Sequence, residues 1–207
     1  MPTADRHLHP LKKRQGARDR ILAAAIAEFS RHGFERAISY IASKAHVNDI
    51  TIYRHFKHKF DLQLAALLEA QSHNPMITYM ESLLAQDRVP DMSTVIGELG
   101  KLGCGPGRDL MAMLYFAGLQ NRKLLLAWEN SPVRNRLMTP LSKYVRRLQE
   151  QGAVRRLDPD VLARAIMGSM LSLFSRNCVF SEMAIADPDS AETASLVAIL
   201  ERRTRHS

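Results

Sequence analysis

Hydrophobic residues recur along most of this chain at the spacing of α-helices. In residues 17–32 they fall at intervals of three and four, which places Ile21, Leu22, Ala25, Ile26 and Phe29 on one side of a helix. No stretch has the alternation of a half-buried strand, and no Asn-Gly or Asp-Gly pair supplies a hairpin turn. The pattern therefore predicts an all-α protein.

Breaks in this pattern divide the chain into predicted helices. Gly33 ends the first one, because glycine is a common helix stop. Two short helices are predicted within residues 38–60, and a longer one begins at Asp61 and is interrupted at Asn74-Pro75. The further predicted helices span residues 76–84, 92–101, 110–128, 132–152, 160–180 and 191–201.

The first of the two short helices carries a regular apolar stripe. Its members are Ile38, Ile41, Ala42 and Ala45, which recur at i, i+3, i+4 and i+7. The stripe stops at His46 and Val47, where a tight turn is predicted. Helix, turn and second helix together form a predicted helix-turn-helix.

The second short helix is predicted to begin after Asn48, a favourable N-cap, with Asp49 at the positive end of the helix dipole. Ile52 and Phe56 lie four residues apart and can both face a core. The remaining side chains are polar, aromatic and cationic. Such a mixture suits a helix that reads the major groove of DNA.

These residues also carry a family resemblance over about residues 16 to 62. The pattern comprises Ile41, Ala42, Ala45, Val47, Thr51, Tyr53, Phe56 and Lys59. It resembles the helix-turn-helix of TetR-type (TetR/AcrR) transcriptional regulators. The resemblance implies an N-terminal three-helix DNA-binding domain and a helical C-terminal domain for ligand binding and dimerisation. Two positions depart from the family pattern, with His46 where the turn usually has glycine and Ala37 where a serine or threonine usually caps the helix.

We predict three parts of the chain. Residues 1–15 form a mobile basic tail, residues 16–60 the DNA-binding domain, and residues 61–207 the ligand-binding and dimerisation domain. Lys12, Lys13 and Arg14 suit a tail that enters a minor groove, although a disordered solubilising end is the simpler explanation of them.

The charge distribution favours a nucleic-acid partner. Net charge is +8, and residues 1–60 hold 12 Lys or Arg against 5 Asp or Glu. A local basic excess of this kind binds a polyanion by displacing its counterions, and charge alone does not separate DNA from an anionic membrane surface. The adjoining helix-turn-helix favours double-stranded DNA.

The resemblance and the exposed positions together assign candidate DNA contacts. The predicted base contacts are Ser39, Asp49, Ile50 and Arg54. The predicted phosphate contacts are Thr51, Tyr53, His55, Lys57 and Lys59. The acidic residue Asp49 is also explained by the helix dipole alone.

The C-terminal domain is predicted to enclose a cavity for a small hydrophobic effector. Pliable and aromatic side chains are frequent there, and the candidates for the lining are Met111, Tyr115, Phe116, Trp128, Met170 and Phe174. For any one of these residues, an ordinary core position is the alternative.

A homodimer is also expected. The predicted helices at residues 160–180 and 191–201 carry apolar and small residues beyond what a single chain needs, as in half of a four-helix interface. The alternative is that both helices pack inward within one chain.

Other classes of function have little support in the sequence. The Gly103–Gly107 run lacks the Gly-Lys-Ser/Thr signature of a phosphate-binding loop, and His55 and His58 have no further ligand at metal spacing. We therefore predict no enzyme activity, no cofactor and no metal site. Cys104 and Cys178 are expected to be ordinary thiols. With no membrane helix and no secretory signal, a cytoplasmic location is expected.

The sequence thus predicts a DNA-binding transcriptional regulator, a repressor released from a palindromic, inverted-repeat operator by a small, largely apolar ligand. The competing hypothesis is an architectural DNA-binding protein that responds to no ligand.

Overall fold

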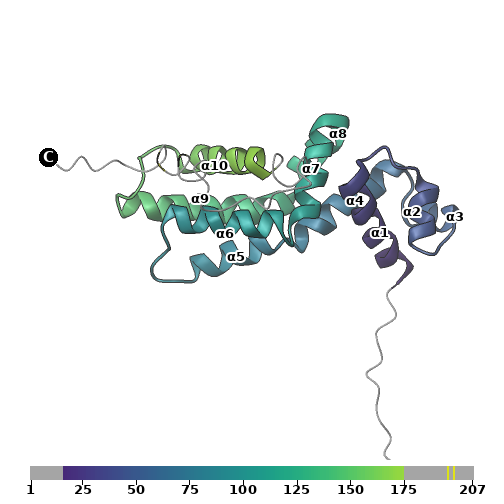
Figure 1. The fold of residues 1–207 in the computed structure, drawn as a ribbon, viewed down its shortest axis with the longest axis horizontal. Helices are drawn as coiled ribbons and strands as arrows, with labels where there is room; N and C mark the ends of the chain where they lie inside the picture. The colour runs from purple at the N-terminus through teal and green to yellow at the C-terminus, as the bar shows by residue number, and fades with distance from the viewer. Residues whose placement is uncertain (1–15, 175–194, 196–197, 199–207) are drawn as a thin grey trace, which may run out of the picture.

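The computed structural model describes residues 16–174 together with residues 195 and 198. Among these residues all regular secondary structure is helical and no β-strand occurs, which confirms the predicted all-α class. The helices form an elongated molecule with the N-terminal helices gathered at one end (Figure 1). No helix in this part of the chain is long and apolar enough to cross a membrane.

The N-terminal end is built from three helices and the start of a fourth. They are α1 (Ala17–His32), α2 (Ile38–Lys44), α3 (Asp49–His55) and α4 (Lys59–Ser72). The predicted stripes face inward, so Ile21, Ile41 and Ile52 are all buried. Phe34 lies between α1 and α2 with its ring centroid 5.0 Å from that of Phe29. Burial of these side chains stabilises the small core.

The C-terminal part is a bundle of longer helices. It contains α5 (Pro75–Leu84), α6 (Met92–Cys104), α7 (Arg108–Gln120), α8 (Arg122–Glu129), the 3₁₀ turn η1 (Pro132–Arg134), α9 (Asn135–Glu150) and α10 (Pro159–Phe174). Helix α9 packs against both α5 and α10. Its buried Tyr144 donates a hydrogen bond to the Pro90 carbonyl at 2.9 Å and so anchors the loop before α6.

Several helix boundaries differ from the sequence predictions. The single helix predicted for residues 110–128 is two helices, because Asn121 ends α7 and its side chain accepts the Leu124 N–H at 3.1 Å to cap α8. Helix α6 continues through Gly103 and Cys104, so the glycine-rich loop is shorter than predicted. Helix α4 begins at Lys59 rather than Asp61, since the Asp61 carboxylate accepts the His58 N–H at 3.0 Å one turn earlier.

Four predictions concern parts of the chain that lie wholly or partly outside the described residues. The basic tail of residues 1–15 and the last part of the predicted helix at 160–180 lie outside, and only residues 195 and 198 of the predicted helix at 191–201 are described, both helical. Cys178 also lies outside.

Cys104, at the end of α6, is disulfide-bonded, so the expectation of an ordinary thiol there was wrong. Which cysteines approach each other depends on helix packing that residue spacing does not reveal.

The two parts of the molecule meet at a buried junction formed by α1, α4 and α7. The Phe34 N–H donates to Gln120 Oε1 at the end of α7, at 3.0 Å, and the Phe34 carbonyl accepts from Gln63 Nε2 of α4 at 2.9 Å. Asn121 Nδ2 lies 3.5 Å from Gln63 Oε1 and extends this chain of polar contacts. Both polar groups of the Phe34 backbone are therefore held by side chains from two other helices.

Gly33 permits this close approach. Its φ angle is +73°, which favours glycine, and a Cβ atom built there would lie 2.5 Å from Gln120 Oε1. A side chain at residue 33 would have to displace the Gln120 amide from Phe34. The glycine that ends α1 is thus also needed for the junction.

The cap of α6 gives a stability prediction. The Asp91 carboxylate accepts the Thr94 N–H at 2.8 Å, and hydrogen bonds from Thr94 hold the pKa of Asp91 below its ordinary value. Because the folded-state pKa is lowered, the charge stabilises the fold above the ordinary Asp pKa of about 3.9, and this contribution is lost as pH falls through the lowered value.

Asp91→Ala should lower the free energy of unfolding by about 1 kcal/mol at pH 7, measured by urea denaturation. Asp91→Asn is the control, since it keeps a capping oxygen but cannot ionise. The stability gap between the wild type and Asp91→Asn should close on acidification below the lowered pKa. A gap that stays constant with pH would show that the Asp91 charge does not contribute.

Candidate DNA-binding face and ligand cavity

The tight turn predicted at His46 and Val47 is present between α2 and α3. His46 has a φ angle of +53°, the left-handed conformation, at the position where the TetR-type pattern usually has glycine. The turn is closed by hydrogen bonds from the His46 N–H to the Ser43 carbonyl at 3.2 Å and from the Val47 N–H to the Ala42 carbonyl at 3.0 Å. These bonds hold a conformation that costs a histidine more than a glycine.

Asn48 caps the second short helix as predicted. Its Oδ1 accepts the Thr51 N–H at 2.8 Å and the Thr51 hydroxyl at 2.7 Å. The Thr51 hydroxyl proton is therefore engaged within the cap, and a phosphate contact by Thr51 stays a prediction. Ala37, at the corresponding position of α2, makes no side-chain cap.

Helix α3 is fixed to the core by its inner side. Ile52 and Phe56 are buried, and the Arg18 guanidinium from α1 lies 5.7 Å from the centre of the Phe56 ring. Because one side of α3 is held in this way, its other side chains have defined positions relative to the rest of the domain.

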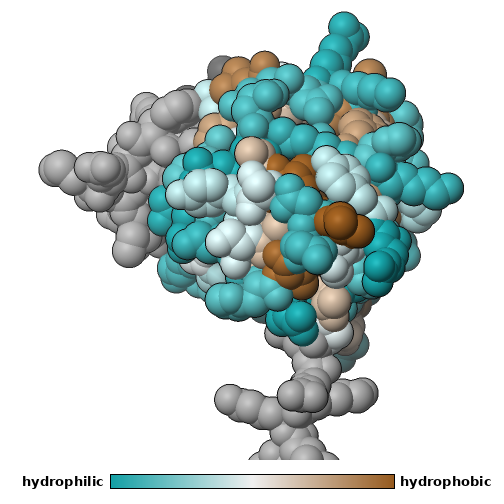
Figure 2. All heavy atoms as spheres, turned by 90° about the vertical axis from the view of Figure 1, so that its right-hand side faces the viewer, coloured by the Kyte–Doolittle hydropathy of each residue, from teal (hydrophilic) through white to brown (hydrophobic). Residues whose placement is uncertain are grey.

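The predicted base-contact residues are all exposed at this end of the molecule. Ile50 is 69% exposed and Tyr53 is 50% exposed, although both are large hydrophobic side chains. The exposed members of the predicted set are Ser39, Asp49, Ile50, Tyr53, Arg54, His55 and Lys57, whereas Thr51 and Lys59 are partly buried. Figure 2 views this end of the molecule and shows hydrophobic groups set among many hydrophilic ones.

Tyr40 is a candidate contact that the sequence reasoning missed. It is 49% exposed and follows Ser39 on α2. The Arg36 guanidinium lies 3.8 Å from the centre of the Tyr40 ring, and Arg36 is itself bound at 2.9 Å by the buried carboxylate of Glu28. This chain of contacts fixes the position of the Tyr40 ring on α2. The available signal was an aromatic residue on the polar side of α2, next to a predicted base contact.

A cavity of about 440 Å³ lies in the C-terminal part, among α7, α8, α9 and α10. Three of the residues predicted to line a cavity, Met111, Tyr115 and Trp128, do line it. Further apolar walls come from residues that the prediction left out, namely Leu114, Leu119, Leu125, Leu137, Met138, Met167 and Leu171. Helical spacing alone did not distinguish these leucines from core residues.

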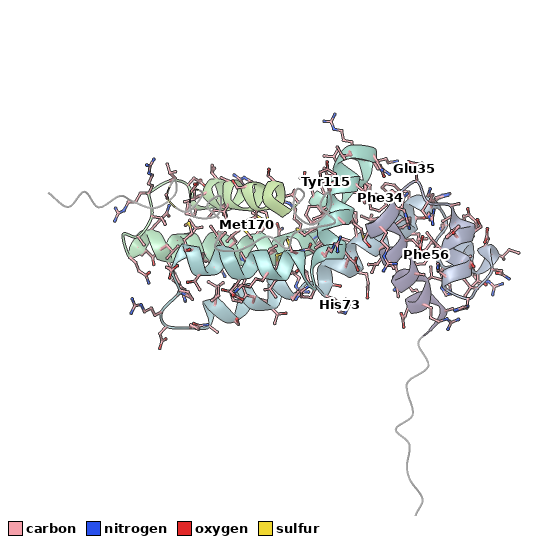
Figure 3. The ribbon with its side chains drawn as sticks, viewed as in Figure 1. Phe34, Glu35, Phe56, His73, Tyr115 and Met170 are labelled. Carbon is pink, nitrogen blue, oxygen red and sulfur yellow. The ribbon has the colours of Figure 1, made fainter. Side chains whose placement is uncertain are left out.

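The other three predicted lining residues lie elsewhere or are not described. Met170 is buried in the core, and Phe116 packs against the core with its ring edge toward Tyr115. In Figure 3, Tyr115 lies near α7 and Met170 near α10. The neighbouring helix positions Met167 and Leu171 take the place at the cavity that was predicted for Met170. The side chain of Phe174 is outside the described part of α10.

The cavity has few polar groups. Gln71 on α4, Arg134 in η1, Glu129 at the end of α8 and Arg164 on α10 reach its wall. The Trp128 indole Nε1 is shielded from solvent and has no hydrogen-bond partner among the described residues. Gln71 and Leu119 link the cavity wall to α4 and α7, the two helices that hold Phe34 at the junction.

His55 and His58 gain no further metal ligand from the fold. In the part of the chain that the structure describes, no three His, Cys, Asp or Glu side chains group so that they could hold a metal ion.

Comparison with known proteins finds a family model that matches the N-terminal helices. Residues 21–66 match the model for "Bacterial regulatory proteins, tetR family". This range contains α2, α3 and the turn between them. No protein with curated annotation matches the chain.

Solved structures share the whole fold. A TetR-family transcriptional regulator of Mesorhizobium loti is 20% identical, with a TM-score of 0.64 over 90% of this chain and 96% of that chain. A transcriptional regulator of Saccharomonospora viridis, solved in complex with choline, is 22% identical, with a TM-score of 0.69 over 90% and 98% of the two chains. The fatty acid degradation regulator FadR of Bacillus halodurans is 21% identical, with a TM-score of 0.64 over 95% and 100%. Residues 21–66 thus match the model of the tetR family, and the chain as a whole shares its fold with TetR-family transcriptional regulators.

Proposed function

We propose that this protein is a sequence-specific repressor that binds a palindromic operator as a homodimer and is released from it by a small, largely apolar ligand. The observation that carries the proposal is the outer side of α3, where base-reading side chains are exposed on a helix whose inner side is buried. A rigid support matters because base readout depends on precise hydrogen-bond geometry.

Each exposed side chain has a specific role in the proposed complex. Arg54 donates two hydrogen bonds to a guanine, Asp49 accepts from a cytosine, and Ile50 contacts a thymine methyl group. Ser39, at the start of α2, is the fourth base contact. The phosphate contacts are Thr51, Tyr53, His55, Lys57 and Lys59, and the position of Tyr40 supports adding it to them.

A homodimer is supported by the outer side of α10. Val161, Ala165, Gly168 and Ser172 recur there at helical spacing and are exposed in the single chain. Small residues allow two helices to approach closely, and a two-fold pair of these faces would supply two of the four helices expected from the sequence. Two recognition helices in one dimer would then bind two half-sites in adjacent major grooves.

The mostly apolar wall of the cavity supports a largely apolar effector. Its volume of about 440 Å³ is typical of small-molecule sites. The Saccharomonospora viridis regulator, which was solved with choline, supports the view that this fold accepts small molecules.

The junction supplies a path between the cavity and the DNA-binding face. Leu119 lines the cavity and directly precedes Gln120, which holds the Phe34 N–H. Gln71 lines the cavity from α4, two turns beyond Gln63, which holds the Phe34 carbonyl. A ligand that shifts α7 relative to α4 would therefore act on the segment between α1 and α2. The ligand weakens DNA binding only if it binds more tightly to the conformation in which the spacing of the two recognition helices does not match the two half-sites.

Selection of bound sites from a random DNA library tests the proposed operator. The expected result is an inverted repeat, with affinity that falls steeply as salt rises because lysine and arginine displace counterions. Bound sequences without dyad symmetry, or with no shared motif, would favour the architectural DNA-binding protein instead.

A pair of variants separates base contacts from phosphate contacts. Arg54→Ala should relax the preference at one base pair, at a cost of about 1 to 3 kcal/mol there, because a bidentate contact is lost. Lys59→Ala is the comparison, and it should weaken all sequences alike and reduce the salt slope by about one unit. Competition binding against single-substitution operators at several salt concentrations measures both effects. Uniform loss of affinity in Arg54→Ala would make Arg54 a phosphate contact.

A further inference from the structure

The wall of the cavity is mostly apolar, and its polar side chains come from α4, α8, η1 and α10. Trp128 comes from α8, Arg134 from η1 and Arg164 from α10, and all three side chains line the cavity. Two of them are cationic and the third has a free N–H donor. Donors and positive charge thus occur on a largely hydrophobic wall, and those of Trp128 and Arg134 come from the adjoining elements α8 and η1.

The Trp128 indole N–H needs an acceptor. Nε1 is buried and has no hydrogen-bond partner among the described residues, whereas buried polar groups in folded proteins are nearly always paired. A ligand with an oxygen acceptor beside Trp128 satisfies the indole N–H, and a purely hydrocarbon ligand leaves it unpaired.

Arg134 is the second polar group at the cavity that a ligand could pair with. It is partly buried, and no carboxylate of the described residues lies within ion-pair distance of it. Glu129, the acidic side chain at this cavity, is exposed and makes no ion pair with Arg134. The charged side chains at the wall are Arg134, Arg164 and Glu129, so positive charge exceeds negative charge by one. Arg134 is the most buried of the three.

We infer that the ligand of this cavity is an amphipathic carboxylate, with its hydrocarbon part between α7, α9 and α10 and its carboxylate toward Trp128 and Arg134. The inference rests on the proposed function, because it names the class of the effector assigned there. A guanidinium pairs a carboxylate with charge-assisted hydrogen bonds, which strengthen where water is excluded. The cavity volume of about 440 Å³ accepts on the order of 15 water-sized groups, enough for a medium-length alkyl chain.

The experiment compares three compounds built on an unbranched eight-carbon chain, with the full-length protein. Octanoate, octan-1-ol and octyltrimethylammonium carry an anionic, a neutral and a cationic head group, and quenching of Trp128 fluorescence reports their binding. We expect octanoate to bind about tenfold more tightly than octan-1-ol, and octyltrimethylammonium to bind most weakly, because a cation meets Arg134.

Variants at the cavity test the assigned cation. Arg134→Met keeps an unbranched side chain but removes the charge, and it should bring octanoate affinity down to that of octan-1-ol. Arg134→Lys should retain a preference for octanoate. Arg136→Met is the matched control, because Arg136 belongs to the next helix and pairs with Glu81 at 3.7 Å without lining the cavity, so its loss should leave both affinities unchanged.

Equal or tighter binding of octan-1-ol or octyltrimethylammonium, or no binding of octanoate, overturns the carboxylate assignment. Operator affinity measured in the same samples separates this result from failure of the proposed function. If the alcohol or the ammonium compound releases the operator, the repressor function stands and only the ligand class is wrong. If octanoate binds as expected but no compound changes operator affinity, the carboxylate site stands and the proposed release mechanism is wrong.

Discussion

The backbone of Phe34 is held from both sides, and the rest of the structure depends on this constraint. Gln120 accepts a hydrogen bond from the Phe34 N–H, and Gln63 donates one to the Phe34 carbonyl. Helices α7 and α4 therefore both bind the segment that connects α1 to α2. Phe34 is 1% exposed and Gln63 is 6% exposed, and a backbone group that lost its partner there would be buried without a hydrogen bond. The DNA-binding helices are thus attached to the bundle at a defined point.

The two ends of the molecule have opposite physical requirements, and the junction joins them. At the DNA-binding end, Ile50 and Tyr53 remain exposed although burial would be favourable, which is the usual cost of a reading surface. At the other end, the bundle leaves a cavity where close packing would be more stable. Both departures lower stability, and the proposed operator and effector would occupy these two sites and offset that loss.

The sequence predicted the DNA-binding end closely and the cavity only partly. The stripe in α1, the cap at Asn48 and the left-handed turn at His46 depend on neighbouring residues, so local spacing sufficed. Met170 was assigned to the cavity but is buried in the core, because the rotation of α10 about its axis depends on packing against α9. Phe34, the hydrogen-bond partner of both Gln63 and Gln120, is distant from them in the chain, and no local pattern indicates these contacts.

The central claim is that ligand binding in the cavity and DNA binding at the recognition helix are energetically coupled through Phe34. The most direct test titrates operator DNA with and without a saturating cavity ligand found by Trp128 quenching, in the wild type, in Gln120→Met and in Gln149→Met. Gln149 is the control because it makes comparable hydrogen bonds, to the carbonyls of Arg155 and Leu157 at 2.9 and 2.7 Å, away from the junction. We expect the ligand to raise the operator Kd by the factor by which operator raises the ligand Kd, since linkage is reciprocal. This factor should fall toward one in Gln120→Met and persist in Gln149→Met. A ligand that binds the wild type without changing its operator Kd, or a factor unchanged in Gln120→Met, would contradict the account.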